Sequence, residues 1–268
     1  MARRRTLAQR ADKYVYYQRS VQEPEVDVAF LDRTFKKTRG RPARSMREDF
    51  AGTSAFSCAW VARHRENTAF AIDLDPEPLD WGRGNNVAAL TPDQQSRVKL
   101  IEGDVRTVGH EPVDVTVAYN FSYFLFDTRP ELVRYFEAAR ATLKSDGLLF
   151  LDVYGGGQAM EALVEETEFD DFIYVWEQKS FDPISHRGEN RIHFKFPDGS
   201  EMRRAFSYDW RIWTIPELRE LLAEAGFSDA HVYWEGTDRK TGEGNDVFSR
   251  RERAEGDPAW VAHIIAVK

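Results

Sequence analysis

The sequence has little cysteine and no long hydrophobic run, and each absence excludes a class of protein. Cys58 is the only cysteine among 268 residues, which excludes an intramolecular disulfide and a cysteine-based zinc site. No apolar stretch approaches the roughly 20 residues that a membrane-spanning helix needs. The basic start of the chain lacks the apolar core of a secretory signal. We therefore expect a cytoplasmic protein.

An excess of positive charge is also missing, since the formal net charge is −8. This balance disfavours a protein that coats nucleic acid. The short run Arg39-Gly40-Arg41-Pro42 is similar to the core of an AT-hook, which inserts into the DNA minor groove. It occurs once, just before a folded domain, so we interpret these residues as a linker or as basic residues that help to cover a site. The histidines form no His-x-x-x-His pair, and we expect no metal.

From Met46 onward, short apolar strands alternate with helical segments. This alternation predicts a doubly wound α/β domain, with a mostly parallel sheet that is covered on both faces. We place this domain at 44–268 and an N-terminal helical extension at 1–43. The pattern changes at about 172–213, where three antiparallel strands predict an inserted cap. The polar stretch 237–258 is interpreted as a loop.

Acidic and polar residues follow four successive strands of the predicted sheet. Glu48 to Ser54 follow the first strand, Asp73 ends the second, Asp104 follows the third, and Tyr119 to Tyr123 follow the fourth. Ligands of such sheets bind beyond the carboxyl ends of the strands, so this topology brings the four positions to one edge. A carboxylate at Asp73 can accept hydrogen bonds from a ribose diol, and one at Asp104 from an adenine amino group.

The turn after the first strand contains a single glycine, Gly52. Dinucleotide sites use three glycines because the backbone must closely approach a pyrophosphate at a helix N-terminus. A nucleoside without phosphate needs close approach at only one or two points. The turn therefore disfavours a nicotinamide dehydrogenase. The following segment is predicted to be a helix that is capped by Thr53 or Ser54.

The segment Glu48-Asp49-Phe50-Ala51-Gly52-Thr53-Ser54 resembles the first motif of class I S-adenosylmethionine-dependent methyltransferases. That motif is an acid followed by a turn of the form L-G-C-G-T-G, and here Phe50 and Ser54 replace its first and last glycines. The second acid of the family fits Asp73 in "AIDLDPE", and the third fits Asp104 in "EGDV". The region after the fourth strand fits "VAYNFSYF".

The resemblance covers roughly residues 45–153, together with the last helix and strand pair. It implies a seven-stranded sheet whose last strand is antiparallel, and S-adenosylmethionine as the cofactor. Glu48 would lie near the methionine amino group, Asp73 would hold the ribose, and Asp104 the adenine amine. The implied cofactor site consists of Glu48, Phe50, Ala51, Gly52, Asp73, Leu74, Asp104, Val105, Tyr119 and Asn120.

Methyl transfer from a sulfonium mainly requires that a nucleophile be held in line with the methyl carbon. An amine needs only a neutral lone pair, whereas a hydroxyl needs a base or its own ionisation. Aromatic side chains are abundant, and we select Tyr123 and Tyr17 as candidates for the catalytic site, with His186 from the cap as a candidate for proton transfer. Phe121 and Ser122 stand where N-P-P-Y motifs have prolines, which disfavours nucleobase or glutamine amide acceptors.

The leading hypothesis is a methyltransferase with a small-molecule acceptor and a nitrogen or oxygen nucleophile, because a cap suits a small buried acceptor better than a duplex. One alternative is an RNA or protein methyltransferase that recruits its acceptor through Arg3–Arg5 and Lys36–Arg44. An alternative of another class is a non-catalytic nucleoside-binding module. The sequence determines neither the acceptor nor the oligomeric state.

Overall fold

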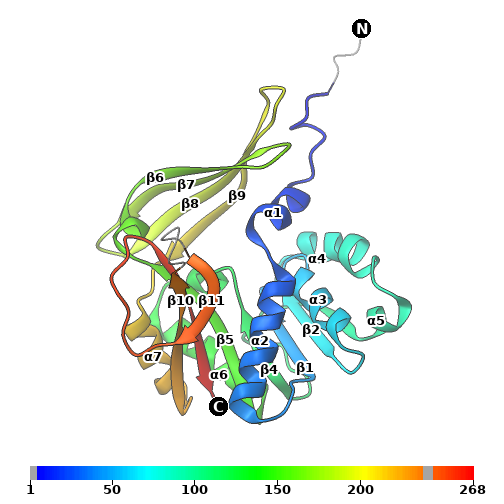
Figure 1. The fold of residues 1–268 in the computed structure, drawn as a ribbon, viewed down its shortest axis with the longest axis vertical. Coiled ribbons are helices and arrows are strands. Elements are labelled where there is room, and N and C mark those ends of the chain that lie inside the picture. The colour runs from blue at the N-terminus through cyan, green and yellow to red at the C-terminus, as the bar shows by residue number, and fades with distance from the viewer. Residues whose placement is uncertain (1–4, 238–243) are drawn as a thin grey trace.

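A computed structural model describes residues 5–237 and 244–268, and its central element is an eight-stranded sheet (Figure 1). The strand order is β11-β10-β12-β5-β4-β1-β2-β3. Neighbours from β5 to β3 run parallel, and β12 is antiparallel to both β5 and β10. The strands are β1 (Ser45–Asp49), β2 (Thr68–Asp73), β3 (Val98–Glu102), β4 (Val113–Ala118), β5 (Leu143–Gly155), β10 (Asp229–Thr237), β11 (Gly244–Arg250) and β12 (Trp260–Val267).

Helices cover both faces of this sheet, which confirms the predicted doubly wound α/β class. Helices α2 and α3 share a buried cluster with one face, and α6 and α7 share another with the opposite face. The sequence starts α6 and α7 in the same way, with a capping box that joins Thr128 to Glu131 and Thr214 to Glu217. The helices are α1 (Lys13–Val21), α2 (Pro24–Arg39), α3 (Ala55–Arg63), α4 (Pro76–Gly82), α5 (Pro92–Ser96), α6 (Arg129–Ala141) and α7 (Ile215–Glu224).

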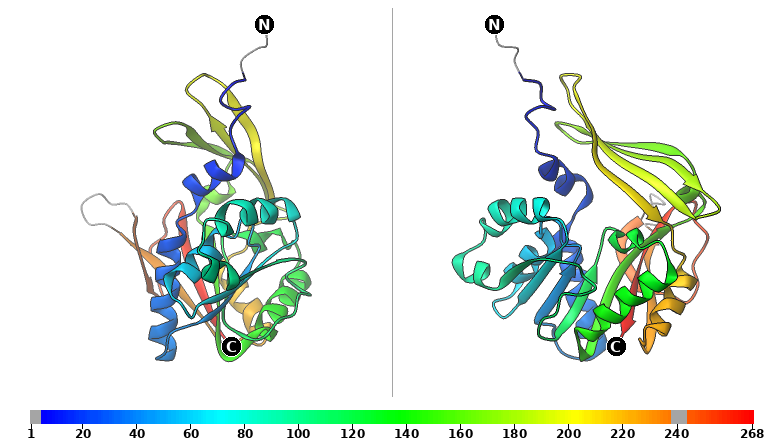
Figure 2. Two further views of the ribbon diagram at one scale, coloured as in Figure 1. Left: turned by 90° about the vertical axis from the view of Figure 1, so that its right-hand side faces the viewer. Right: turned by 180° about the vertical axis from the view of Figure 1, so that it is seen from behind.

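The inserted cap is a second, antiparallel sheet in the order β6-β7-β8-β9. Its strands are β6 (Leu163–Glu168), β7 (Ile173–Asp182), β8 (Arg187–Lys195) and β9 (Glu201–Arg211). Figures 1 and 2 show this sheet standing beyond one end of the central sheet, with α1 beside it. The expected bounds of 172–213 omitted β6. This strand lies at the sheet edge, and almost all of its residues are exposed. Because neither of its faces is buried, its sequence lacks the alternation of apolar and polar residues by which a strand is predicted.

Two further expectations need correction. The stretch 237–258 is not only loop, because β11 pairs with β10 as an edge strand and adds an eighth strand to the seven expected. Ser54 does precede α3, but its side chain makes no capping hydrogen bond. An exposed polar edge strand carries little hydrophobic signal, which is why the sequence pattern there indicates a loop.

The two N-terminal helices have different environments. Helix α2 packs on one face of the central sheet, where Val28, Leu31 and Phe35 join the cluster that includes Val117 and Phe150. Helix α1 packs instead against the cap, on the cluster of buried cap phenylalanines. The extension predicted at 1–43 therefore contributes one helix to the domain and one to the cap.

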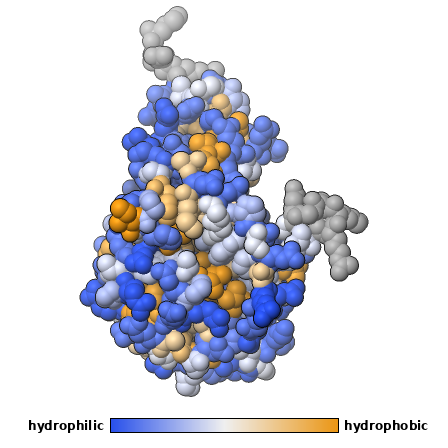
Figure 3. All heavy atoms as spheres, turned by 90° about the vertical axis from the view of Figure 1, so that its left-hand side faces the viewer, coloured by the Kyte–Doolittle hydropathy of each residue, from blue (hydrophilic) through white to orange (hydrophobic). Residues whose placement is uncertain are grey.

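The surface is mostly hydrophilic on the face that Figure 3 shows, where apolar residues form separate patches. Within the described ranges, none of the helices combines the length and apolar character that crossing a bilayer requires. The cytoplasmic location stays a prediction.

Candidate active site

A cavity lies at the carboxyl ends of β1, β2 and β4, between the turn after β1, helix α1 and strand β9. This is the edge at which the sequence placed a ligand. The cavity brings together the following predicted residues: Tyr17, Glu48, Phe50, Ala51, Gly52, Asp73, Tyr119 and Asn120.

The turn after β1 has an unusual backbone. Phe50, Gly52 and Ser54 have φ angles of 56°, 51° and 59°, so all three are left-handed. These are the positions at which the methyltransferase motif has glycine. A left-handed conformation costs a residue with a Cβ about 1–2 kcal/mol, and the ring of Phe50 offsets this by packing on Tyr135, with ring centroids 5.5 Å apart. The backbone of the turn thus keeps the left-handed conformation that glycine favours, although two of the three glycines are replaced.

Asp73 joins the second strand to this turn. One carboxylate oxygen, Oδ2, accepts a hydrogen bond of 2.7 Å from the backbone N–H of Gly52, and Oδ1 accepts one of 2.9 Å from Asp75. Burial raises the pKa of Asp73. A Cβ placed on Gly52 would meet no atom within 4 Å, so the cavity is open directly above this residue. The arrangement presents one carboxylate and one bare stretch of backbone to a ligand.

Glu48 is buried at the end of β1, with 8% of its surface exposed. Its Oε2 accepts hydrogen bonds from the backbone N–H and the hydroxyl of Ser57, at 2.9 and 2.5 Å, in the first turns of α3. Burial nevertheless raises the pKa of Glu48 to about 8. The helix therefore satisfies one oxygen of this carboxylate.

Helix α1 lines the cavity and is fixed on both sides. The side-chain amide of Gln18 donates to the hydroxyl of Thr53 at 2.7 Å, which ties α1 to the turn after β1. The hydroxyl of Tyr14 donates to Glu77 at 2.9 Å, and Lys13 forms an ion pair of 2.8 Å with the same carboxylate. These contacts hold α1 across the opening between the turn and α4.

The cap contributes aromatic groups to the same cavity. The ring of Tyr17 packs on Phe206 of β9 with centroids 4.8 Å apart, and Tyr208 of β9 also lines the cavity. Burial raises the pKa of Tyr17 to about 12, so its phenol stays protonated at neutral pH. Tyr17 can therefore position a ligand by hydrogen bonding, but it is not a base under those conditions.

The loop after β4 is held in a left-handed conformation by a buried acid. Asn120 and Phe121 have φ angles of 58° and 55°, and their N–H groups donate to the carboxylate of Asp152 at 2.6 and 2.9 Å. Burial raises the pKa of Asp152 to about 8. Asn120 lines the main cavity, while Phe121 lines a second hollow beneath the cap together with Trp176.

Two predicted catalytic residues lie elsewhere. Tyr123 is fully buried in the main core, and its hydroxyl donates to the backbone carbonyl of Asp152 at 2.7 Å. The reversal at Asn120 and Phe121 leads into a short 3₁₀ turn, η2 (Ser122–Leu125), whose second residue faces inward. His186 lies in the turn between β7 and β8, with Nδ1 2.5 Å from the carbonyl oxygen of Ile212. Neither side chain lines the cavity.

Three predicted adenine contacts also lie outside the cavity lining. Leu74 is exposed, Val105 is buried in the core, and Asp104 forms an ion pair of 2.6 Å with Arg106. That neighbouring cation lowers the pKa of Asp104, mainly through the side-chain hydrogen bond. Its carboxylate is thus occupied by the chain itself.

The cavity also includes acids and aromatics that were not selected from the sequence. The most notable is Asp27 of α2, together with Phe56 of α3. Asp27 precedes the buried Val28 and lies one helical turn before the buried Leu31. An acid next to the apolar face of an amphipathic helix was the available signal. Across residues 5–237 and 244–268, no group of three or more His, Cys, Asp or Glu side chains is arranged to hold a metal ion.

Neither a protein-family model nor a curated protein sequence matches the chain. Solved structures match over nearly its whole length. An S-adenosylmethionine-dependent methyltransferase from Clostridium acetobutylicum is 14% identical, with a TM-score of 0.67 and coverage of 95% of this chain and 96% of that one. CalS10, an amino pentose methyltransferase from Micromonospora echinaspora solved with bound S-adenosylmethionine, is 17% identical, with a TM-score of 0.65 and 95% coverage of both chains.

A third match is the sugar N-methyltransferase KedS8 from Streptoalloteichus, which is 15% identical with a TM-score of 0.64 and covers 96% of this chain and 93% of that one. Together these likenesses confirm the predicted fold. The chain has the class I S-adenosylmethionine-dependent methyltransferase fold, with an antiparallel insertion and N-terminal helices.

Proposed function

We propose that the chain is an S-adenosylmethionine-dependent methyltransferase that acts on a nitrogen or oxygen atom of a small molecule. The observation that carries this proposal is the left-handed backbone at Phe50, Gly52 and Ser54. These are the three glycine positions of the cofactor motif, and the turn opens into a cavity beside Asp73 and Glu48. Fold and site thus support the same ligand.

In this proposal Asp73 holds the ribose of the cofactor. Each carboxylate oxygen has two lone pairs, so hydrogen bonds from Gly52 and Asp75 leave capacity for the ribose hydroxyls. Gly52 provides the surface on which the nucleoside end lies. Glu48 and Tyr119 then face the methionine end of the ligand.

When bound, the cofactor supplies a methyl group that a sulfonium already activates. The chain must exclude water and hold the acceptor in line, which is a matter of proximity and orientation. Tyr17, Asn120 and Tyr208 are placed to do this, because they line the cavity between the loop after β4 and the cap. An amine acceptor needs only to be in its neutral form and requires no base from the protein. This suits a site in which Tyr17 and Tyr208 remain protonated and cannot act as bases.

The position of helix α1 beside the cavity favours a small acceptor. Helix α1 is fixed over the opening by Gln18 and Tyr14, which leaves little access for a duplex or a folded protein. CalS10 and KedS8, which share the fold, are described as an amino pentose and a sugar N-methyltransferase. We therefore favour a nitrogen nucleophile on a sugar-like acceptor.

Part of the basic segment 36–44 that could recruit a macromolecule is paired within the chain, while Arg3 and Arg4 lie outside the described residues. Arg41 forms ion pairs of 2.8 Å with both Asp114 and Asp146, at the amino end of the parallel strands and away from the cavity. None of residues 39–42 lines the cavity, contrary to the interpretation that they help to cover the site. This placement disfavours the RNA or protein methyltransferase hypothesis.

The proposal is tested first by binding and then by turnover. Isothermal titration calorimetry is expected to detect S-adenosylhomocysteine but not NAD⁺, and Asp73→Ala is expected to weaken the interaction by about 1–3 kcal/mol. Methyl-labelled S-adenosylmethionine is then incubated with a panel of amino sugars, alkylamines and phenols. Binding without any methylated product would favour the non-catalytic module, and absence of binding would contradict the proposal.

A further inference from the structure

Asp27 is the unusual acid of the cavity. Its carboxylate lines the wall, yet it makes no hydrogen bond and no ion pair with any described residue. Glu48 and Asp73, by contrast, each accept hydrogen bonds from backbone N–H groups. The hydroxyl of Tyr119 on the same wall is likewise buried and without a partner among the described residues. Two polar groups on one part of the cavity are therefore left unsatisfied by the chain.

The surroundings of Asp27 are acidic rather than basic. Burial, followed by the nearby charge of Glu23, raises the pKa of Asp27 to about 7. Asp27 also raises the pKa values of Tyr119 and Asp152, although burial is the main cause for both groups. Among the cavity residues described, Lys13 is the cation, and it is already paired with Glu77. The cation that Asp27 lacks would have to come from a ligand.

We propose that Asp27 binds the ammonium group of the methionine portion of the cofactor, with the hydroxyl of Tyr119 beside it. This inference rests on the proposed function. With the nucleoside between Gly52 and Asp73, the ligand extends past Glu48 toward Tyr119 and α2. Glu48 was the partner that the family resemblance implied. Its carboxylate is already supported by Ser57 at the start of α3, whereas that of Asp27 has no support.

A ligand carrying an ammonium group offsets the cost of burying this carboxylate, because an opposite charge at close range favours the ionised acid. A neutral nucleoside cannot provide this compensation. Asp27 would thus discriminate between ligands with and without the amino group, while Asp73 and Gly52 act on all of them alike.

The experiment removes the carboxylate of Asp27 and the amino group of the ligand, separately and together. Calorimetry measures the affinities of the wild type and Asp27→Asn for S-adenosylhomocysteine, for its deaminated analogue, and for 5′-methylthioadenosine, which lacks the amino acid portion. Deamination is expected to cost the wild type roughly 10- to 100-fold in affinity, and to cost Asp27→Asn several-fold less. Methylthioadenosine should bind both proteins equally. Glu25→Gln, the same charge change at an exposed position of α2, serves as the control and should keep the wild-type pattern.

The possible failures are distinguishable. An unchanged penalty for deamination in Asp27→Asn overturns the inference, and so does a loss of affinity that is equal for all three ligands, since that indicates a structural role. A wild type that binds none of the three contradicts the proposed function itself. If Asp27→Asn does not fold, as judged by its thermal unfolding, Asp27→Glu takes its place. Its longer side chain should then shift the affinity for S-adenosylhomocysteine and leave that for methylthioadenosine unchanged.

Discussion

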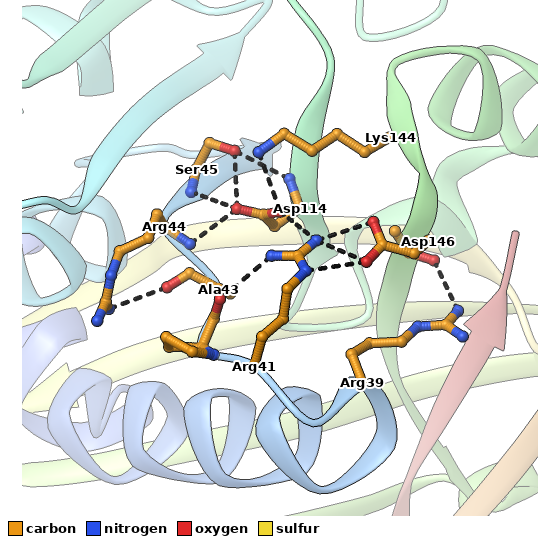
Figure 4. A network of polar contacts seen from close by, with 10 residues as sticks. Arg39, Arg41, Ala43, Arg44, Ser45, Asp114, Lys144 and Asp146 are labelled. Atoms are coloured by element: carbon orange, nitrogen blue, oxygen red, sulfur yellow. Dashed lines mark hydrogen bonds and ion pairs between the residues drawn. The ribbon is translucent and has the colours of Figure 1, made fainter.

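Buried carboxylates lie at both ends of the parallel strands, but the charges around Asp114 at the amino end differ from those around Glu48 and Asp152 at the carboxyl end. At the amino end, Asp114 of β4 is fully buried and forms ion pairs with Arg41 at 2.8 Å and Lys144 at 3.0 Å (Figure 4). Its pKa is lowered to about 2, because hydrogen bonds and these cations outweigh the effect of burial. At the carboxyl end, burial raises the pKa values of Glu48 and Asp152 to about 8.

The difference lies in what surrounds each acid. Asp114 also accepts hydrogen bonds from the backbone N–H groups of Arg44 and Ser45 at 2.8 and 3.0 Å, so it locks the start of β1 to β4. Glu48 and Asp152 accept hydrogen bonds but have no cationic partner among the described residues. The carboxylate at the amino end therefore contributes to stability, whereas Glu48 and Asp152 at the carboxyl end are acids that a cationic ligand would favour in the ionised form.

The largest effect is expected at the amino end. Asp114→Ala leaves two cations and two backbone N–H groups without their acceptor. Breaking a buried ion pair typically costs about 3–5 kcal/mol, and we expect the lower part of this range because Arg41 and Lys144 are partly exposed. Urea denaturation measures the change in unfolding free energy.

Asp146→Ala is the matched control for this prediction. It removes the more exposed acid that shares Arg41, and a pair of that kind contributes less than about 1 kcal/mol. Affinity for S-adenosylhomocysteine should not change in either variant that folds. Equal losses of unfolding free energy in the two variants would show that burial does not determine how much Asp114 contributes to stability.

The two ends should also respond to pH with opposite sign. Asp114 has a lowered pKa in the folded chain, so its contribution is present above about pH 4 and is lost as the pH falls toward 2. Glu48 has a raised pKa, so the folded state binds more protons than the unfolded state between about pH 4.5 and 8. Unfolding free energy should therefore decrease as the pH rises through this window.

Urea denaturation at a series of pH values checks both signs. Glu48→Gln should flatten the decline between about pH 5 and 8, because the neutral amide does not titrate. The loss of stability below pH 4 should be unaffected by this substitution. A decline that keeps its wild-type slope in Glu48→Gln would assign the titration to other groups.

At the carboxyl end, the backbone of the turn is expected to matter more for binding than for folding. The space above Gly52 is open, so Gly52→Val places a side chain where the nucleoside would lie. A β-branched residue at φ 51° adds about 1–2 kcal/mol of strain to the fold. We expect affinity for S-adenosylhomocysteine to fall beyond detection by calorimetry while the chain still unfolds cooperatively. Tight binding by this variant would place the ligand elsewhere.

The same comparison explains what the sequence could predict. The apolar strands and the acids at their ends indicated the fold and the edge that carries the site, because both signals come from short, regular patterns. Asp73 and Gly52, which were selected from the sequence, both line the cavity, since the topology alone brings them together. Strands β6 and β11 gave no such signal, because edge strands with exposed polar residues lack alternation.

The direction in which a side chain points could not be predicted from the sequence patterns. Tyr123 follows a left-handed pair of residues whose conformation depends on Asp152, which is 29 residues away in the sequence. Asp27 reaches the cavity only because α2 is packed against the sheet by its apolar neighbours. Both facts depend on tertiary contacts, which a single sequence read by local spacing does not contain.

The smallest effect is expected at the last of the three left-handed positions. Ser54 is fully buried at φ 59°, and its hydroxyl has no hydrogen-bond partner among the described residues. Ser54→Gly relieves the strain of the Cβ and removes an unsatisfied polar group, but it also gives the unfolded chain more freedom. These contributions nearly cancel, so we expect a stabilisation between zero and about 1 kcal/mol, with unchanged affinity for S-adenosylhomocysteine.

Phe50→Gly, at the first left-handed position of the same turn, is the variant to compare with Ser54→Gly. It relieves the same strain but removes a ring that packs on Tyr135 and Phe126, with centroids 5.5 and 6.0 Å apart. The lost packing should dominate, with a destabilisation of about 2–4 kcal/mol in thermal or urea unfolding. A Ser54→Gly variant that is destabilised as strongly as Phe50→Gly would mean that the buried hydroxyl has a partner, such as an ordered water, that holds the turn in place.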